Sequence, residues 1–301
     1  MNEHSLPRSV LSAGMALVWA LITAGANAEW ILDGTTGVEF DDNLPRAQLD
    51  SDIESDVALD AALSAGQFVQ LTDRIGFTLV ADLRGAHYAE FDGLDYASAG
   101  LTTSLRGKLG LGADAPWVQA TAGFAAYDHR FEPRDGLRYR AGLAAGRSIG
   151  TRLNLTARYA FERRRSDEVT DIPFLVNFFG IHGDAFDGDN HSLSISGTYT
   201  VTQRLALVVG YTRRMGDVTA TTRINEEIFE YSDAIAPDPV FGQDKFAYRI
   251  DADTDIFNVD LSFALGDHTA LNFGYEYRDS NAGEDLTYTN NIARIGLRFR
   301  Y

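Results

Sequence analysis

The chain has 301 residues, no cysteine and a formal net charge of −17. The lack of cysteine excludes any disulfide framework, and the acidic excess argues against binding nucleic acid by bulk electrostatic attraction. No segment beyond residue 28 approaches the 18 consecutive apolar residues that a membrane-spanning helix requires.

The first 28 residues have the pattern of an export signal. Arg8 precedes an apolar run at residues 10–22, and Ala26-Asn27-Ala28 provides a cleavage site of the small-x-small type. The run is too short to span a bilayer, although a buried N-terminal helix would be an alternative. We therefore predict a signal peptide over residues 1–28, a mature domain over residues 29–301, and a function in the periplasm, the outer membrane or outside the cell.

Twelve segments of the mature chain alternate apolar and polar residues with a period of two. In the first, Val38 and Phe40 alternate with Glu39 and Asp41. In chain order the segments are residues 30–41, 57–65, 75–84, 101–109, 118–124, 137–143, 153–162, 192–201, 205–212, 257–265, 271–277 and 294–301. Such strands fit a wall with hydrocarbon on one side and water on the other, as in a transmembrane barrel. A secreted β-sandwich also has alternating strands and is the main alternative.

The connections between these segments alternate in length. Short connections at residues 67–73, 110–116, 146–151, 202–204 and 266–269 alternate with long ones at residues 42–52, 128–136, 163–190 and 213–255; residues 92–95 are a short exception. Short periplasmic turns and long outer loops are typical of outer-membrane barrels, and aromatic residues near both ends of the strands predict two interfacial girdles. We predict an all-β, antiparallel up-and-down barrel of about 12 strands, closed by its first and last strands.

The last eight residues form the most amphipathic strand. Ile295, Leu297, Phe299 and Tyr301 alternate with three arginines and Gly296. With Gly296, Phe299 and the terminal Tyr301, this segment resembles the C-terminal insertion signal of Gram-negative outer-membrane β-barrels. The resemblance implies a place in the Gram-negative outer membrane, contact with its lipid and lipopolysaccharide, and recognition of the last strand by the barrel assembly machinery.

A second resemblance lies at the end of the first predicted strand. The segment GVEFDDN, residues 37–43, resembles the start of putative β-barrel porin families found with exopolysaccharide systems, and of the barrel in surface lipoprotein assembly modifiers. In those families an aromatic residue followed by Asp-Asp-Asn often leads into the first outer loop, with Tyr common where this chain has Phe40. The resemblance implies a role in envelope transport without choosing between the families.

The polar faces of the predicted strands are rich in charged residues. Arg106, Lys108, Arg138, Arg140, Arg158, Arg164 and Arg214 come from the fourth to ninth segments, and Glu39, Asp41, Asp60, Asp82, Glu90 and Asp260 come from the remaining wall and its outer ends. Closing the barrel places these two groups on opposing walls of the lumen, where they can attract and orient solutes. Salt-bridged filling of a narrow barrel is the alternative. The loop at residues 213–255 can fold inward as a constriction or stand outside as a binding surface.

Signals for metal or catalytic chemistry are weak. Asp251, Asp253 and Asp255 have the spacing that begins a calcium loop, but the positions that an EF-hand needs for Gly and Glu do not hold them; loose divalent binding by loop carboxylates stays an alternative. His191 and Ser192 are adjacent and so point to opposite faces of a strand, which argues against a barrel hydrolase.

The sequence favours a porin-like channel for small polar or charged solutes, with saccharides among the candidates. The alternative is a non-conducting surface barrel whose long outer loops bind a partner or polymer. We expect no enzyme activity, cofactor or structural metal.

Overall fold

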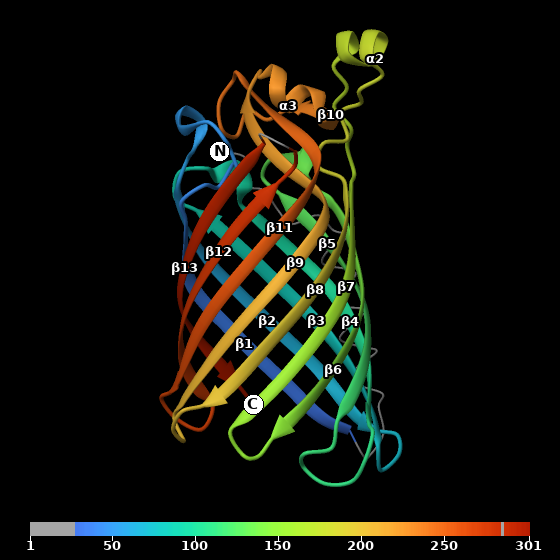
Figure 1. The fold of residues 1–301 in the computed structure, drawn as a ribbon, viewed down its shortest axis with the longest axis vertical. Coiled ribbons are helices and arrows are strands. Elements are labelled where there is room, and N and C mark those ends of the chain that lie inside the picture. The colour runs from blue at the N-terminus through green and yellow to red at the C-terminus, as the bar shows by residue number, and fades with distance from the viewer. Residues whose placement is uncertain (1–27, 284–285) are drawn as a thin grey trace, which may run out of the picture.

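The computed structural model describes residues 28–283 and 286–301, so the predicted signal peptide, Ala28 apart, lies outside the described residues. The chain forms a tall barrel with short turns at the end that carries the C-terminus and larger connections at the other end (Figure 1). The strands are β1 (Ala28–Asp41), β2 (Asp56–Gln70), β3 (Ile75–Tyr88), β4 (Tyr96–Lys108), β5 (Trp117–His129), β6 (Gly136–Ile149), β7 (Leu153–Ser166), β8 (Gly188–Thr200), β9 (Leu205–Arg223), β10 (Ser232–Pro237), β11 (Lys245–Ala264), β12 (Thr269–Asn281) and β13 (Thr287–Arg300).

The strands close into an antiparallel barrel. Neighbouring strands pair in chain order, β13 pairs with β1, and β9 pairs directly with β11. The short β10 pairs with the outer part of β11 and forms an isolated bridge with His182, so it stands outside the wall, which consists of the other 12 strands. The predicted fold class, strand number and closure are confirmed.

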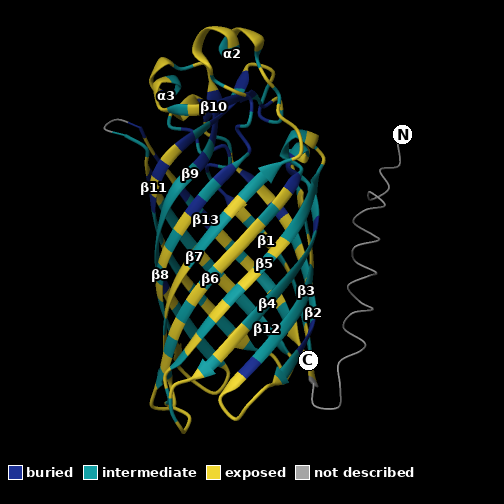
Figure 2. Ribbon diagram, turned by 90° about the vertical axis from the view of Figure 1, so that its right-hand side faces the viewer, coloured by how far each residue is buried: buried dark blue, intermediate teal, exposed yellow. Residues whose placement is uncertain are grey.

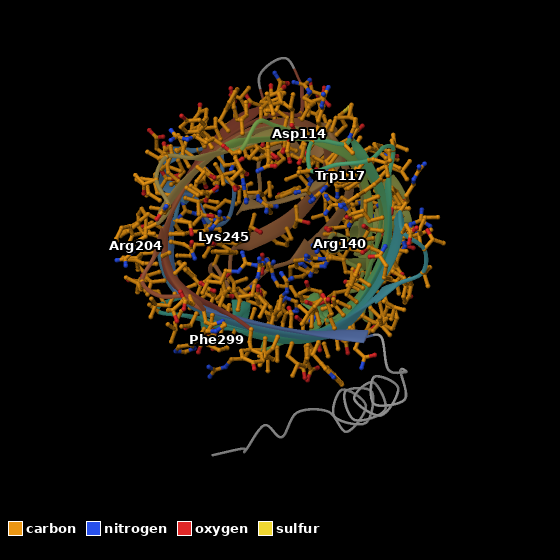
Figure 3. All side chains as sticks on the ribbon, turned by 90° about the horizontal axis from the view of Figure 1, so that it is seen from below. Asp114, Trp117, Arg140, Arg204, Lys245 and Phe299 are labelled. Carbon is orange, nitrogen blue, oxygen red and sulfur yellow. The ribbon has the colours of Figure 1, made fainter. Side chains whose placement is uncertain are left out.

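The alternation of the strands separates a lipid face from a lumen face. Ile295, Leu297 and Phe299 lie on the outer surface, each between 43% and 47% exposed. On the opposite face of β13, Arg298 and Arg300 both pair with Asp33 of β1 across the strand seam, at 2.6 Å and 2.9 Å. Viewed along the barrel, Phe299 lies outside the ring of strands and Arg140 lies within it (Figure 3). The amphipathic strands therefore have the orientation that a membrane wall requires.

Two glycines face each other where the first and last strands meet. Gly37 pairs with Gly296, and a Cβ atom at Gly296 would lie 2.8 Å from the Thr36 carbonyl oxygen. We expect Gly296→Val to push β1 and β13 apart, to destabilise the barrel by about 1–3 kcal/mol and to lower the yield of folded protein. Heat-modifiable migration on SDS gels measures that yield. Leu297→Val, on the roomy lipid face, is the matched control; equal yields for the two variants would contradict this role of Gly296.

The outer connections differ from the prediction at their ends. The loop predicted at residues 213–255 is shorter, because β9 continues to Arg223 and β11 begins at Lys245, and these two residues pair directly. The loop predicted at residues 163–190 is also shorter, because β7 continues to Ser166 and β8 begins at Gly188. The outer connection between β12 and β13, which the sequence did not mark as a loop, is the sixth link at this end.

Short helices occupy these connections. They are η1 (Asp50–Asp52), η2 (Asp92–Leu94), η3 (Glu132–Arg134), α2 (Pro173–Phe179) and α3 (Glu226–Glu230). Within residues 28–283 and 286–301, no helix is long and apolar enough to cross a membrane.

The outer arm formed by residues 216–252, which we call the cap, holds most of the buried hydrophobic residues among those that the structure describes. It comprises the outer ends of β9 and β11 with α3 and β10 between them. Val218, Ile250 and Tyr248 of the cap belong to one buried cluster, together with Leu286 and Tyr288 near the start of β13. Ala234 and Ala247 belong to a second buried cluster with Phe186 of the β7–β8 connection. Buried residues accordingly gather at the outer end of the barrel (Figure 2).

The cap extends across the mouth of the barrel. It arises between β9 and β11, and in the strand order the β3–β4 connection lies on the opposite wall. Phe241 of the cap nevertheless packs on Phe91 of that connection, with ring centroids 4.9 Å apart. Asp238 accepts a hydrogen bond of 2.6 Å from Arg134 of the β5–β6 connection. The long loop therefore lies over the mouth and contacts the far rim, and only its ends, such as Arg214 and Asp217, reach the lumen among the described residues.

Candidate functional site

A cavity of about 600 Å³ lies in the outer half of the lumen beneath the cap. Its lining includes seven arginines and only three carboxylates. The arginines are Arg46, Arg138, Arg140, Arg158, Arg164, Arg214 and Arg278, and the carboxylates are Glu162, Asp187 and Asp217. The excess of cationic groups makes this enclosed space electropositive although the whole chain is acidic.

Strand register brings these arginines together. Arg138 and Arg140 stand two residues apart on β6, so both side chains point to the same face. Arg138 is opposite Arg164 of β7, and Arg140 is opposite Glu162. Because paired residues of neighbouring strands share a face, the alternation of both strands delivers these four charged groups to one region of the wall.

Most of the cavity arginines have fixed polar partners. Arg140 Nε donates to Glu162 at 2.6 Å, and Arg138 Nε lies 3.6 Å from the same carboxylate. Arg164 donates to the Arg134 carbonyl oxygen at 2.8 Å, and Arg214 donates to the Asn190 side chain at 2.9 Å. Carbonyl and amide oxygens hold a guanidinium group in place without cancelling its charge, so the cavity stays cationic.

Arg158 differs from the other cavity arginines. Within the part of the chain that the structure describes, its guanidinium has no hydrogen bond or ion pair, and its side chain is exposed to the lumen. The hydroxyl groups of Ser192, Ser194 and Thr212 line the same cavity. Arg158 is therefore a solvated cation beside a hydroxyl-rich wall, where an anionic or hydroxylated solute can replace water.

The acidic residues predicted for the opposite wall are mostly paired. Glu39 accepts a hydrogen bond from Arg294 at 2.5 Å, Asp82 accepts one from Ser64 at 2.6 Å, and Asp260 accepts one from Asn258 at 2.8 Å. Asp60 lies near Gly37, whose Cβ position would be 3.2 Å from the Asp60 carboxylate. Glu39, Asp82 and Asp260 therefore have local partners, whereas the 600 Å³ cavity is lined by an excess of arginines.

Two of the predicted cationic residues lie apart from the cavity. Arg106, at the periplasmic end of β4, places its guanidinium 4.0 Å from the ring centroid of Trp117. Lys108 follows two residues later at the end of the same strand. Neither residue lines the 600 Å³ cavity, which does contain Arg138, Arg140, Arg158, Arg164 and Arg214.

Sequence reasoning missed two arginines of the cavity. Arg278 lies on β12, one residue beyond the predicted end of that strand, and it pairs with Glu276. Arg46 lies in the β1–β2 connection and reaches the lumen from a loop, which strand alternation does not address. A longer assignment of β12 would have found Arg278, whereas no local signal marks Arg46.

A buried ion pair fixes the cap to the β1–β2 connection. Lys245 Nζ lies 2.8 Å from the Asp52 carboxylate, and the two side chains are only 4% and 1% exposed. Thr222 and the Arg223 amide also donate to Asp52. Burial by itself would raise the pKa of Asp52, but these hydrogen bonds and the Lys245 charge hold it far below its ordinary value. The carboxylate therefore stays ionised at neutral pH.

The residues considered for metal or hydrolase chemistry have other partners in the structure. Asp253 and Asp255 both pair with Arg213 at 2.7 Å, and no group of three potential ligands occurs among the described residues. His191 contacts the Tyr159 hydroxyl at 2.8 Å, whereas Ser192 lines the lumen cavity. The two residues point in opposite directions, as the alternation predicts.

Comparison with known proteins places the fold. No protein-family model and no curated protein sequence matches the chain. The structure is similar to an outer-membrane channel from Pseudomonas putida, with a TM-score of 0.57 and 13% identity over 92% of this chain and 97% of that one. The NanC porin and the KdgM porin in complex with disordered oligogalacturonate match with TM-scores of 0.45 and 0.43 and identities of 12% and 10%. They cover 90% of this chain and 100% and 99% of theirs. The chain thus shares its barrel fold with the Pseudomonas putida channel.

Proposed function

We propose that the protein is a porin-type channel of the outer membrane that passes small polar solutes and favours anionic ones. The observation that carries this proposal is the cavity in which seven arginines face three carboxylates. A barrel of 12 strands lies between the filled barrels of 8 strands and the open channels of 16 or more, so side chains and the cap decide the size of the path.

Charge and hydroxyl groups support the choice of solute. A narrow space with low-dielectric walls focuses the field of its arginines and raises the local concentration of anions. Guanidinium groups match carboxylates in a bidentate geometry, and the serine and threonine hydroxyls of β8 and β9 can bind sugar hydroxyls. Saccharides that carry carboxylate groups combine both kinds of group and are the solute class that we propose.

Purified protein in planar bilayers should give discrete conductance steps. We expect Arg158→Ala to lower the current carried by anions, because this guanidinium is exposed in the lumen and has no partner among the described residues. Arg138→Ala should have a similar effect. Arg130→Ala is the matched control, since Arg130 is exposed in the β5–β6 connection and pairs with Asp92. A bilayer that stays sealed would contradict the channel, and identical currents in all variants would contradict the role of the cavity.

A second candidate function has one specific observation in its favour. Phe174, Phe178 and Phe179 of α2 are between 56% and 73% exposed at the outer tip of the molecule, while Leu175 packs toward the cap. Such a patch suits a non-conducting surface barrel that binds a partner or polymer. Deleting residues 167–187, which spares β7 and β8, would then abolish surface binding without loss of assembly; unchanged binding would count against this alternative.

We also propose the route to the membrane. The signal peptide at residues 1–28 would direct export, and β13 with Gly296, Phe299 and Tyr301 would be read by the barrel assembly machinery. The exposed apolar faces of the strands would contact outer-membrane lipid and lipopolysaccharide.

A further inference from the structure

The Asp41-Asp42-Asn43 motif at the end of β1 forms a compact hydrogen-bonded cluster with β13. The Asn43 side chain donates to the Ala47 carbonyl oxygen at 2.9 Å and to the Thr289 carbonyl oxygen at 3.0 Å. The Asn43 side-chain oxygen accepts from the Ala47 amide at 2.8 Å. Asn290 of β13 donates to the Asp41 carboxylate at 3.0 Å and to the Asn43 carbonyl oxygen at 2.5 Å. Asp41, Asn43, Ala47 and Asn290 are all buried.

These bonds fix the loop on both sides of Arg46. The Asn43 side chain bridges to Ala47, and the Arg46 amide donates to the Asn43 carbonyl oxygen at 3.0 Å. The turn that results holds Arg46 at a φ of 55°, and among the described residues Arg46 is the one that is not glycine yet has positive φ. A long side chain in the left-handed region is unfavourable and persists only where the surroundings impose it, which often happens at functional sites.

The strained turn sends the Arg46 side chain toward the lumen. Arg46 lines the 600 Å³ cavity together with Arg164, Arg214 and Arg278. Within residues 28–283 and 286–301, its guanidinium makes a single hydrogen bond, which is long, at 3.5 Å to the Thr219 carbonyl oxygen of the cap. Burial, and then the charges of Arg278 and Arg214, lower the pKa of Arg46 to about 10. A half-buried cation among like charges, with one weak partner, is less favourable than the same cation with an anion beside it.

A second observation points to a ligand in the same place. Arg138, which also lines the cavity, has a buried Nε atom that makes no hydrogen bond, since its ion-pair partner, the Glu162 carboxylate, lies 3.6 Å away. Buried guanidinium nitrogens normally make a hydrogen bond. Arginines supplied by a loop, by β6, by β7, by β9 and by β12 thus surround one space, and their donors outnumber the acceptors that the protein provides there.

We propose that Arg46 completes a binding site for a polyvalent oxyanion, such as a phosphate- or polycarboxylate-bearing solute, and that Asn43 and Asn290 are positioning residues that aim it. The Asp-Asp-Asn motif then does more than join β1 to β13. It orients Arg46 of the loop toward the arginines of the barrel wall, so that an anion is bound by both. The physiological meaning of this site rests on the proposed channel function, but binding is measurable without ion flow.

The test uses inorganic pyrophosphate and the folded full-length protein in detergent. Isothermal titration calorimetry at constant ionic strength, balanced with sodium chloride, should show saturable binding to the wild-type protein. Arg46→Gln should weaken binding about tenfold or more, the loss expected for a charge-assisted hydrogen bond. Arg130→Gln removes the same charge from an exposed loop site and should bind like wild type. Citrate in a parallel titration distinguishes a general oxyanion site from one that selects phosphate.

The positioning role has its own readout. Asn43→Ser and Asn290→Ser should each weaken pyrophosphate binding although neither residue lines the cavity, while heat-modifiable migration confirms a closed barrel. Combined with Arg46→Gln, Asn43→Ser should cause no further loss, because Asn43 acts through Arg46. Absence of binding to wild type, equal affinities for Arg46→Gln and wild type, or additive losses in the double variant would each overturn the proposal. Conductance without pyrophosphate binding would refute the anion site and leave the proposed channel function standing. Pyrophosphate binding without conductance would refute the channel function and leave the anion site standing.

Discussion

Replacing residues 224–244 with a two-residue Asn-Gly turn is expected to raise the single-channel conductance several-fold. Arg223 and Lys245 pair directly across the ladder, so a tight hairpin turn can join them without disturbing β9 or β11. The replacement removes α3, β10 and the segment that packs on the far rim through Phe241. The mouth then loses its cover, while the cavity beneath keeps its arginines.

A reversible control is available because the chain has no cysteine. A Cβ atom built at Gly93 lies 3.3 Å from the Val240 Cβ atom, close to the separation of about 3.5–4.5 Å that a disulfide needs. The double variant Gly93→Cys with Val240→Cys should hold the cap on the rim when oxidised and release it when reduced. Conductance in the shortened variant that equals wild type would show that the cap does not limit the path.

Lys245→Met is expected to release the cap from the β1–β2 connection. The substitution leaves the Asp52 carboxylate buried at 1% exposure without its main counter-charge. Loss of one partner of a buried ion pair costs about 3–5 kcal/mol, and the remaining bonds from Thr222 and Arg223 place the expected value at the lower end. Amide hydrogen exchange across residues 216–223 and 245–252 should quicken accordingly, while exchange in the barrel wall stays slow.

The double variant Asp52→Asn with Lys245→Met separates the loss of the ion pair from the cost of leaving the Asp52 carboxylate buried without Lys245. It removes both charges, so no buried carboxylate is left with only the partly exposed Arg223 guanidinium, 3.3 Å away, as its counter-charge, and much of the protection should return. Equal protection of the cap in wild type and Lys245→Met would contradict a structural role for this ion pair.

The wall of the barrel was predictable because one physical rule governs it. Hydrocarbon on one face and water on the other impose a period of two, which the strand ending in Ile295, Leu297 and Phe299 shows clearly. The period of two is lost where protein, and not lipid or water, covers both faces of a strand. The outer ends of β9 and β11 are packed on both faces, so Val218, Thr221 and neighbouring residues carry no simple alternation, and these segments were predicted as loop.

The candidate site was partly predictable for the same reason. Arg138, Arg140 and Arg158 follow from strand phase alone, since each stands on a lumen position of a strand that was identified. Arg46 does not follow, because its direction depends on hydrogen bonds between residues about 246 positions apart, such as that from Asn43 to Thr289. Contacts of this kind arise only when the first and last strands meet, and no single segment of the sequence encodes them.

The reversal potential of the purified protein in a planar bilayer, measured under a gradient of potassium chloride, tests the central claim most directly. The arginine-lined lumen predicts preferential passage of chloride, with a shift toward neutrality in Arg158→Ala. A cation-selective potential, or a folded protein that carries no current with or without its cap, would contradict the account.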